Sequence, residues 1–332
     1  MPVIRLWNDI EIPRMGLGCW AIGGPFFSGT MSLGYTGAND RESRRAIATG
    51  LDLGIRLFDT AAVYGVGHSE RLLGLTVGNR HDVLVSTKLG PVFDEPSRQV
   101  LGEDYSPDYI ARSIDASLRR LRRERIDLLF LHLNALPVVK AQLAFAALDE
   151  AVRQGKVGAY GWSTDFPESA AAVAGRDNFK AVEHCMNVFF DAASMLEVTS
   201  KNALVAFIRS PLAMGLLSGK FTRHSELPAD DVRSNNLAWM DYFKDGRAAP
   251  ALLAALQRVR DLLCSGGRTP AQGALGWLLA KAPHLVPLPG FRLAAQVEEN
   301  VGALDQGALP ADVMAAIEAA IARPAAGGVR ER

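Results

Sequence analysis

Eight short apolar segments, most of them followed by a stretch with helical spacing, constrain the fold of this chain more than any other feature. Parallel strands need crossover connections, and helices that alternate with strands supply them. Eight such units close a (β/α)8 TIM barrel of the α/β class, which typically takes about 250 residues. The expected strands are residues 15–20, 55–59, 82–88, 126–132, 157–163, 181–187, 203–210 and 284–287.

The remaining residues fit around such a barrel. Residues 3–6 and 11–12 flank a polar turn, a pattern typical of an N-terminal β-hairpin. Extra C-terminal helices are expected near 293–303 and 310–322. We therefore predict a single barrel over residues 1–325 and a disordered tail over 326–332. A doubly wound sheet is the alternative, but the glycine-rich turn after the first strand lacks the GxGxxG pattern of that fold.

Composition and charge narrow the classes of function. The chain has 36 basic and 36 acidic side chains, so its zero net charge gives no electrostatic case for binding nucleic acid or an anionic membrane. Cys19, Cys185 and Cys264 have no paired spacing, and we expect neither a disulfide nor a metal site. The N-terminus lacks a signal-peptide pattern, and no apolar run reaches membrane-spanning length. We therefore expect a cytoplasmic protein.

Four reactive side chains lie at or just after the carboxyl ends of successive predicted strands. Asp59 ends the second strand, Tyr64 follows it, Lys88 ends the third strand and His132 ends the fourth. In a parallel barrel these ends meet on one face, where active sites are built. Taken singly, each residue has a structural explanation, such as a capping Asp or a buried, hydrogen-bonded His. Their shared position favours an active site.

These residue types indicate proton transfer to an oxygen atom. A Tyr phenol has an ordinary pKa of about 10, and a Lys ammonium held by an Asp would lower that pKa. A His within hydrogen-bond reach can orient a substrate carbonyl beside the phenol. None of the four side chains can deliver a hydride, so a reduction would need a cofactor.

Several ordered motifs resemble those of the aldo-keto reductase superfamily over nearly the whole chain. They are DTAAVYG at 59–65, STK at 86–88, DLLFLH at 127–132, GWST at 161–164, SPLAMGLLSGK at 210–220 and PGFRLAAQVEEN at 289–300. The resemblance implies a barrel that reduces a small-molecule aldehyde or ketone to an alcohol with NADPH, with NADH as the less favoured cofactor. It also implies that Tyr64 is the proton donor, that Lys88 and Asp59 tune it, and that His132 orients the carbonyl.

The same resemblance implies a nucleotide site. Backbone N–H groups near Ser210 and the charge of Lys220 would hold the pyrophosphate, and Arg292 would take the 2′-phosphate that distinguishes NADPH from NADH. The full set of expected cofactor-binding residues is Gly18, Cys19, Trp20, Ser163, Thr164, Glu183, Arg209, Ser210, Pro211, Leu212, Gly215, Lys220, Arg233, Gly290, Arg292, Gln296, Glu299 and Asn300.

Three residues depart from the family pattern near the expected nicotinamide. Thr164 stands where an Asn usually follows the Ser, Glu183 where a Gln usually contacts the carboxamide, and Arg209 where an aromatic ring usually stacks on the nicotinamide. A guanidinium can also stack on a flat ring, and we expect Glu183 to pair with it.

Two other functions are compatible with this type of barrel. The potassium-channel beta subunits resemble the family but serve mainly as nucleotide-binding regulatory partners. A Schiff-base barrel using Lys88 would leave both nucleotide motifs unexplained. The four reactive residues favour an enzyme, and we expect Trp20, Phe26 and Phe93 to contact its substrate. The identity of that substrate and the oligomeric state stay open at this level.

Overall fold

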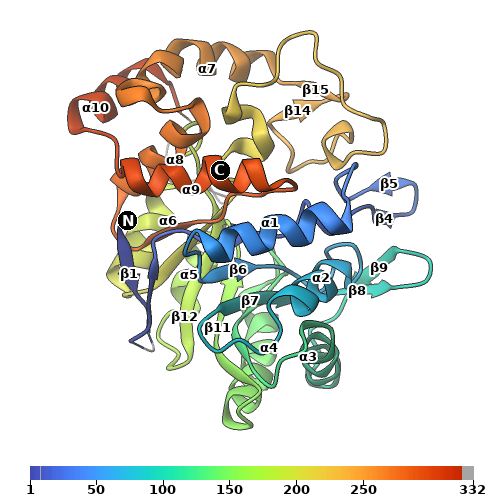
Figure 1. Cartoon of the computed structure of the whole chain (residues 1–332). Coiled ribbons are helices and arrows are strands. Elements are labelled where there is room, and N and C mark those ends of the chain that lie inside the picture. Colours follow the sequence, from blue (N-terminus) through green and yellow to red (C-terminus); the bar gives the residue numbers. More distant parts are fainter. Residues whose placement is uncertain (8, 324–332) are drawn as a thin grey trace.

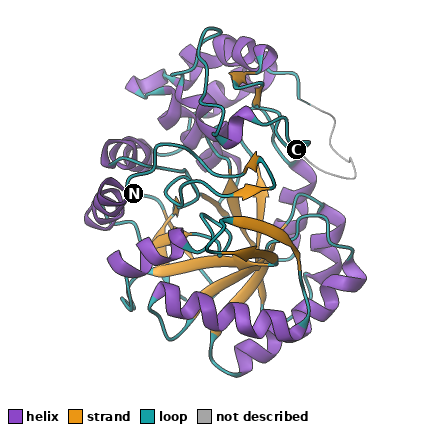
Figure 2. Ribbon diagram, turned by 90° about the vertical axis from the view of Figure 1, so that its right-hand side faces the viewer, coloured by secondary structure: helices purple, strands orange, loops and turns teal. Residues whose placement is uncertain are grey.

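A parallel barrel occupies the centre of the computed structural model, which describes residues 1–7 and 9–323 (Figures 1 and 2). The eight strands follow the order β16-β13-β12-β11-β10-β7-β6-β3. This confirms the predicted fold class, while the predicted tail at 326–332 lies outside the described residues. The strands are Leu17–Gly18 (β3), Leu57–Asp59 (β6), Leu84–Leu89 (β7), Ile126–Leu131 (β10), Val157–Ser163 (β11), Phe179–Cys185 (β12), Val205–Arg209 (β13) and Leu285–Pro287 (β16).

The first and last strands close the barrel. The Gly18 N–H donates to the Pro289 carbonyl at 3.0 Å, and Gly18 forms a parallel bridge with Gly290. A β-carbon at Gly18 would lie 2.9 Å from the carbonyl oxygen of Leu288, so glycine permits this close approach. Closure brings residues from the two ends of the sequence to the same rim.

Helices surround the barrel on its outer side (Figure 2). Their starts follow local signals: Ser106 caps α3 with Pro107 at its first position, and Thr269 and Gln272 form a capping box on α8. The helices are Asp40–Asp52 (α1), His68–Thr76 (α2), Pro107–Leu121 (α3), Val138–Arg153 (α4), Pro167–Val173 (α5), Ala193–Lys201 (α6), Pro250–Leu263 (α7), Pro270–Lys281 (α8), Ala294–Gln306 (α9) and Ala311–Ala320 (α10).

An inner apolar core fills the barrel below the catalytic end. Phe130 and Phe207 meet edge-on there, with ring centres 5.5 Å apart. The predicted N-terminal hairpin is present as Val3–Arg5 (β1) and Glu11–Pro13 (β2). It adds Leu6 and Ile12 to this inner core and so covers the end of the barrel opposite the active site.

One small sheet lies beside the barrel mouth. It is formed by residues 21–39 and 90–104, two segments that the sequence predicts only as loops. Its order is β5-β4-β9-β8 (Figure 1). These strands are too short to show a local alternation of side chains, and their pairing joins segments about 70 residues apart, so the local pattern does not reveal them. The strands are Phe27–Ser28 (β4), Met31–Ser32 (β5), Pro91–Asp94 (β8) and Gln99–Glu103 (β9).

The long segment after β13 carries only short elements. Two 3-10 helices and a two-stranded hairpin lie between the barrel and α7, and a third 3-10 helix precedes α8. They are Ala213–Ser218 (η1), Val232–Ser234 (η2), Phe243–Lys244 (β14), Arg247–Ala248 (β15) and Ser265–Gly267 (η3).

Candidate active site

A cavity of about 760 Å³ opens at the carboxyl ends of the barrel strands. It is continuous from the predicted catalytic motif to both predicted nucleotide motifs, as a dinucleotide site requires. The predicted site residues on its wall are Gly18, Trp20, Phe26, Asp59, Tyr64, His132, Ser163, Glu183, Arg209, Ser210, Pro211, Leu212, Gly215, Lys220, Arg233, Gly290, Arg292, Gln296, Glu299 and Asn300.

Lys88 lies just behind this wall, fully buried on β7. Its Nζ lies 2.5 Å from Asp59 Oδ2 and 3.2 Å from Glu183 Oε2, and it donates to the Thr60 carbonyl oxygen at 2.9 Å. The Ser86 hydroxyl donates to the second Asp59 oxygen at 2.7 Å. Two carboxylates, one from β6 and one from β12, therefore hold a single ammonium ion.

Tyr64 lies against this ion-pair cluster in the loop between β6 and α2. The Lys88 Nζ is 5.2 Å from the centre of the phenol ring, and the His132 ring meets it edge-on at 5.9 Å. The loop depends on Gly65, where φ is +60° and a β-carbon would lie 1.9 Å from the Gly23 carbonyl oxygen. The four side chains predicted for catalysis thus lie together.

Aromatic rings form the wall beside Tyr64. Trp20 stacks on Tyr64 at 5.8 Å, meets Tyr35 edge-on at 5.1 Å and approaches Trp239 at 6.1 Å. Tyr35 and Trp239 both line the cavity, although the sequence did not single them out, because they lie in long segments without a strand or helix pattern. Phe93 is not on the wall; its ring packs 5.8 Å from the guanidinium of Arg120.

Burial decides the proton affinities at the catalytic end. It raises the pKa of Tyr64 above its ordinary value; Lys88 acts in the opposite direction, and Glu183 and Asp59 add to the rise. The expected net lowering of the Tyr64 pKa is therefore wrong, because one ammonium does not outweigh burial and two carboxylates. Burial also lowers the pKa of His132 to about 3, with Lys88 adding to the effect, so its imidazole is neutral at pH 7.

The nucleotide end combines irregular backbone with positive charge. Ser210, Met214 and Gly215 all have positive φ and line the cavity, so the backbone of this turn is irregular where it meets the cavity. Burial lowers the pKa of Lys220, and repulsion from Arg233 and Arg292 lowers it further. Like charges that converge on one cavity wall fit the pyrophosphate and 2′-phosphate of NADPH.

The adenosine end of the cavity has a polar group that fits a nucleotide. Asn300 is 2% exposed and lines the cavity, and its Nδ2 has no hydrogen-bond partner among the described residues. A buried donor without a partner is unfavourable, and a ligand acceptor would satisfy it. Gln296 also lines this end, and its Oε1 accepts from the Arg292 N–H at 2.8 Å.

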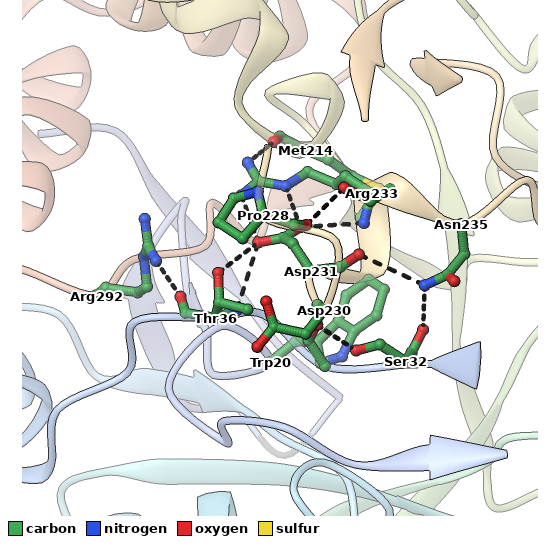
Figure 3. A network of polar contacts seen from close by, with 12 residues as sticks. Trp20, Ser32, Thr36, Met214, Pro228, Asp230, Asp231, Arg233, Asn235 and Arg292 are labelled. Atoms are coloured by element: carbon green, nitrogen blue, oxygen red, sulfur yellow. Dashed lines mark hydrogen bonds and ion pairs between the residues drawn. The ribbon is translucent and has the colours of Figure 1, made fainter. Parts of the chain in front are cut away.

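A chain of polar contacts crosses the nucleotide end (Figure 3). Arg292 donates to the Thr36 carbonyl, and the Thr36 hydroxyl donates to Asp231 at 3.2 Å. Asp231 in turn accepts from Arg233 at 2.7 and 2.8 Å, and Arg233 donates to the Met214 carbonyl at 3.3 Å. The contacts tie the segment after β5 to η1, η2 and the start of α9.

The residues that depart from the family pattern have partners other than those expected. Arg209 forms an ion pair with the fully buried Asp165, whereas Glu183 pairs with Lys88. The expected Glu183–Arg209 pair is wrong, because Glu183 faces the barrel interior and Asp165 supplies the nearer carboxylate. The Thr164 hydroxyl donates to the Asn134 carbonyl at 2.7 Å, behind the cavity wall.

Two further residues near the cavity were missed and one further residue was misplaced. Asp165 lies two residues after the end of β11, close to the strand-end position that singled out Asp59, and it could have been found in that way. Asn134 lines the cavity from the loop after β10. Cys19 was expected to contact the cofactor, but it is fully buried behind the wall, with its thiol 3.7 Å from the Leu17 carbonyl oxygen.

Two features are absent from the part of the chain that the structure describes. No group of three or more His, Cys, Asp or Glu residues is arranged to hold a metal ion there. No helix in that part has the length and apolar character needed to cross a membrane.

Comparison with known proteins identifies the family. The model of the Aldo/keto reductase family matches residues 15–322. The chain is 25% identical to the aldo-keto reductase yakc [NADP(+)] of Schizosaccharomyces pombe, covering 92% of this chain and 87% of the relative. It is 28% identical to the NADH-specific methylglyoxal reductase of Escherichia coli, covering 92% and 94%.

A solved structure supports the same assignment. The glycerol dehydrogenase from Gluconobacter oxydans is 30% identical and superposes with a TM-score of 0.79, covering 96% of this chain and 94% of that one. With the shared motifs, the barrel and one continuous cavity, the chain belongs to the aldo/keto reductase family.

Proposed function

We propose that this protein reduces an aldehyde or ketone to an alcohol with NADPH, and that Tyr64 donates the proton to the carbonyl oxygen. The observation that carries the proposal is the position of the Tyr64 ring on the cavity wall, between the Lys88 ammonium at 5.2 Å and the His132 ring at 5.9 Å. NADPH, when bound, supplies the hydride.

The chain's own residues provide the acid and the orientation. Near neutral pH Tyr64 is protonated and His132 is neutral, so both can direct a hydrogen bond at the carbonyl oxygen. As Tyr64 gives up its proton, the positive charge of Lys88 stabilises the phenolate that forms, and Asp59 keeps Lys88 in place.

The remaining predicted residues divide between cofactor and substrate. Lys220, Arg292 and the backbone of η1 would hold the phosphates, and Asn300 would meet the adenosine. The Arg209 guanidinium, fixed by Asp165, would lie along the nicotinamide. Trp20 and Phe26 form an apolar wall for the group attached to the carbonyl.

The test is NADPH consumption with a panel of sugar, aliphatic and aromatic aldehydes and short ketones. Tyr64→Phe should lower kcat by roughly 10²–10⁴, the range for a general acid, with little change in NADPH affinity. Tyr105→Phe, which removes a half-buried phenol near Lys140, is the matched control and should keep full turnover.

Two results would count against the proposal. Near-normal turnover in Tyr64→Phe would remove Tyr64 as the proton donor. Tight NADPH binding without consumption by any carbonyl of the panel would instead favour a nucleotide-binding regulatory role.

A further inference from the structure

The buried cluster around Lys88 contains two carboxylates but only one ammonium group. Lys88 forms ion pairs with Asp59 at 2.5 Å and with Glu183 at 3.2 Å, and all three side chains are buried. Asp59 has a second partner in the Ser86 hydroxyl, which donates to it at 2.7 Å. Glu183 is therefore the less strongly held of the two acids.

Charge balance at low dielectric decides which acid carries a proton. With both acids ionised, the buried cluster would have a net charge of −1, which burial disfavours. Protonation of Glu183 leaves a neutral Lys88–Asp59 pair. In agreement with this geometry, burial raises the pKa of Glu183 to about 8; Asp59 adds to the rise, and Lys88 opposes it.

The other charged groups that face Glu183 do not neutralise the extra negative charge of the cluster. Arg209, on the adjacent strand β13, is engaged by Asp165. Tyr64 faces Glu183 from the loop after β6 and is protonated near neutral pH. The cluster thus has four titratable members, Asp59, Lys88, Tyr64 and Glu183, of which Glu183 is the one poised to change charge near neutrality.

We propose that Glu183 is a positioning residue whose protonation state, acting through Lys88, sets how readily Tyr64 gives up its proton. The inference rests on the proposed role of Tyr64 as donor. During reduction, the proton of the Tyr64 hydroxyl passes to the carbonyl oxygen and leaves a phenolate beside Lys88. Neutral Glu183 leaves the Lys88 charge available to that phenolate, whereas ionised Glu183 adds a second negative charge to the cluster.

The sign of the pH dependence follows from this arrangement. As the pH rises through about 8, Glu183 ionises and the phenolate becomes harder to form, so the reduction rate at saturating NADPH should fall. The fall should be on the order of three- to tenfold between pH 7 and 9, as expected for one added charge several ångströms away in a protein. Tyr64 itself does not titrate in this window.

The test compares kcat–pH profiles of the holoenzyme and of Glu183→Gln, which keeps the size of the side chain but cannot ionise. The variant should lose the decline between pH 7 and 9. In the reverse reaction, alcohol oxidation with NADP⁺, Tyr64 must act as the base, so above pH 8 the variant should turn over faster than the wild type, because the phenolate is then easier to form. Glu183→Asp should keep an ionisable group and restore a decline with a shifted midpoint.

Controls separate this inference from its alternatives. Glu197→Gln, on the exposed side of α6, should reproduce the wild-type profile, and urea unfolding curves establish that each variant is folded. Superimposable wild-type and Glu183→Gln profiles would overturn the role of Glu183. If Tyr64→Phe is inactive at the same time, only this inference fails; if Tyr64→Phe is active, the proposed function fails first.

Discussion

At the scale of single residues, burial and the neighbouring charges together set the charge state of each group in the centre. Lys88 is fully buried, and burial opposes its charge, but Asp59 and Glu183 raise its pKa above the ordinary value. Burial also lowers the pKa of His132, where no carboxylate offsets it, and so keeps the imidazole neutral. A carbonyl oxygen in the cavity would therefore face two neutral hydrogen-bond donors backed by a fixed positive charge.

Cofactor choice also belongs to this scale, and it depends on Arg292. Arg292 lines the cavity two residues before α9, donates to the Thr36 carbonyl, and is half-buried. We expect Arg292→Ala to weaken NADPH binding by roughly 1.5–3 kcal/mol, the range for a hydrogen bond to a charged group. NADH lacks the 2′-phosphate, so its affinity should hardly change. Fluorescence titration of both cofactors measures the difference.

Arg258→Ala is the matched control for this prediction. Arg258 lies on α7 and donates to the Ala320 carbonyl at 3.2 Å, away from the cavity. Its loss should leave both affinities unchanged. If Arg292→Ala weakened the binding of NADPH and of NADH equally, Arg292 would act by holding the Thr36 segment rather than by contacting the 2′-phosphate. The named relatives include both an NADP(+) and an NADH protein, which makes the outcome informative.

At the scale of elements, two consecutive titratable side chains of β12 lie on opposite faces of the strand. Glu183 points into the barrel, and the next residue, His184, points to the outer side, as the two-residue period of a strand requires. His184 is 1% exposed; its Nδ1 lies 3.2 Å from the Cys185 carbonyl, and its Nε2 has no hydrogen-bond partner among the described residues. Burial lowers the pKa of His184 to about 4.

This lowered pKa predicts a specific loss of stability in acid. Between pH 6.5 and 4 the unfolded chain binds a proton at His184 that the folded protein does not, so the free energy of unfolding falls as the pH falls through this window. His184→Gln has no imidazole to take up this proton. Between pH 6.5 and 4 its free energy of unfolding should therefore fall less than that of the wild type, by up to a few kcal/mol. Urea unfolding at a series of pH values measures it.

The exposed His224→Gln serves as the control for His184→Gln. It should leave the pH dependence of unfolding as in the wild type. The pKa of His132 is also lowered by burial, so His132 also makes the folded protein less stable in acid. His132 is present in the wild type and in both variants, so only the difference between wild type and His184→Gln reports on His184. Parallel curves for wild type and His184→Gln would contradict the prediction.

At the scale of the whole molecule, the cavity couples the two ends of the chain. Gly18 and Gly290 meet where the barrel closes, and both line the same cavity as the strand ends between them. A ligand that fills this cavity contacts elements from β3 to α9. Binding should therefore stabilise the folded chain as a unit.

The corresponding prediction concerns unfolding with NADPH present. At a hundredfold excess over its Kd, NADPH should raise the free energy of unfolding by roughly 2.7 kcal/mol, since the unfolded chain has no such site. Denaturant titrations with and without NADPH measure the change, with ionic strength matched by sodium chloride. Fluorescence titration establishes the NADPH concentration that saturates the site. If the free energy of unfolding does not rise at that concentration, the site does not depend on the closed barrel, and the prediction is wrong.

The sequence by itself determined the barrel and the set of reactive residues. The alternation of strand and helix patterns is local, and so are the helix caps, which explains why all eight strands were found. Asp59, Lys88 and His132 could be grouped because the carboxyl ends of parallel strands share one rim. Tyr64 joined them through its place in the DTAAVYG motif.

Only the tertiary structure decided the partners and charge states of these residues. Glu183 pairs with Lys88 across the barrel, and Arg209 pairs with Asp165. The Tyr64 pKa rises because burial and two carboxylates outweigh one lysine. Distances between side chains on separate strands, and the exclusion of water from them, depend on how the barrel closes. No local pattern in the chain encodes them.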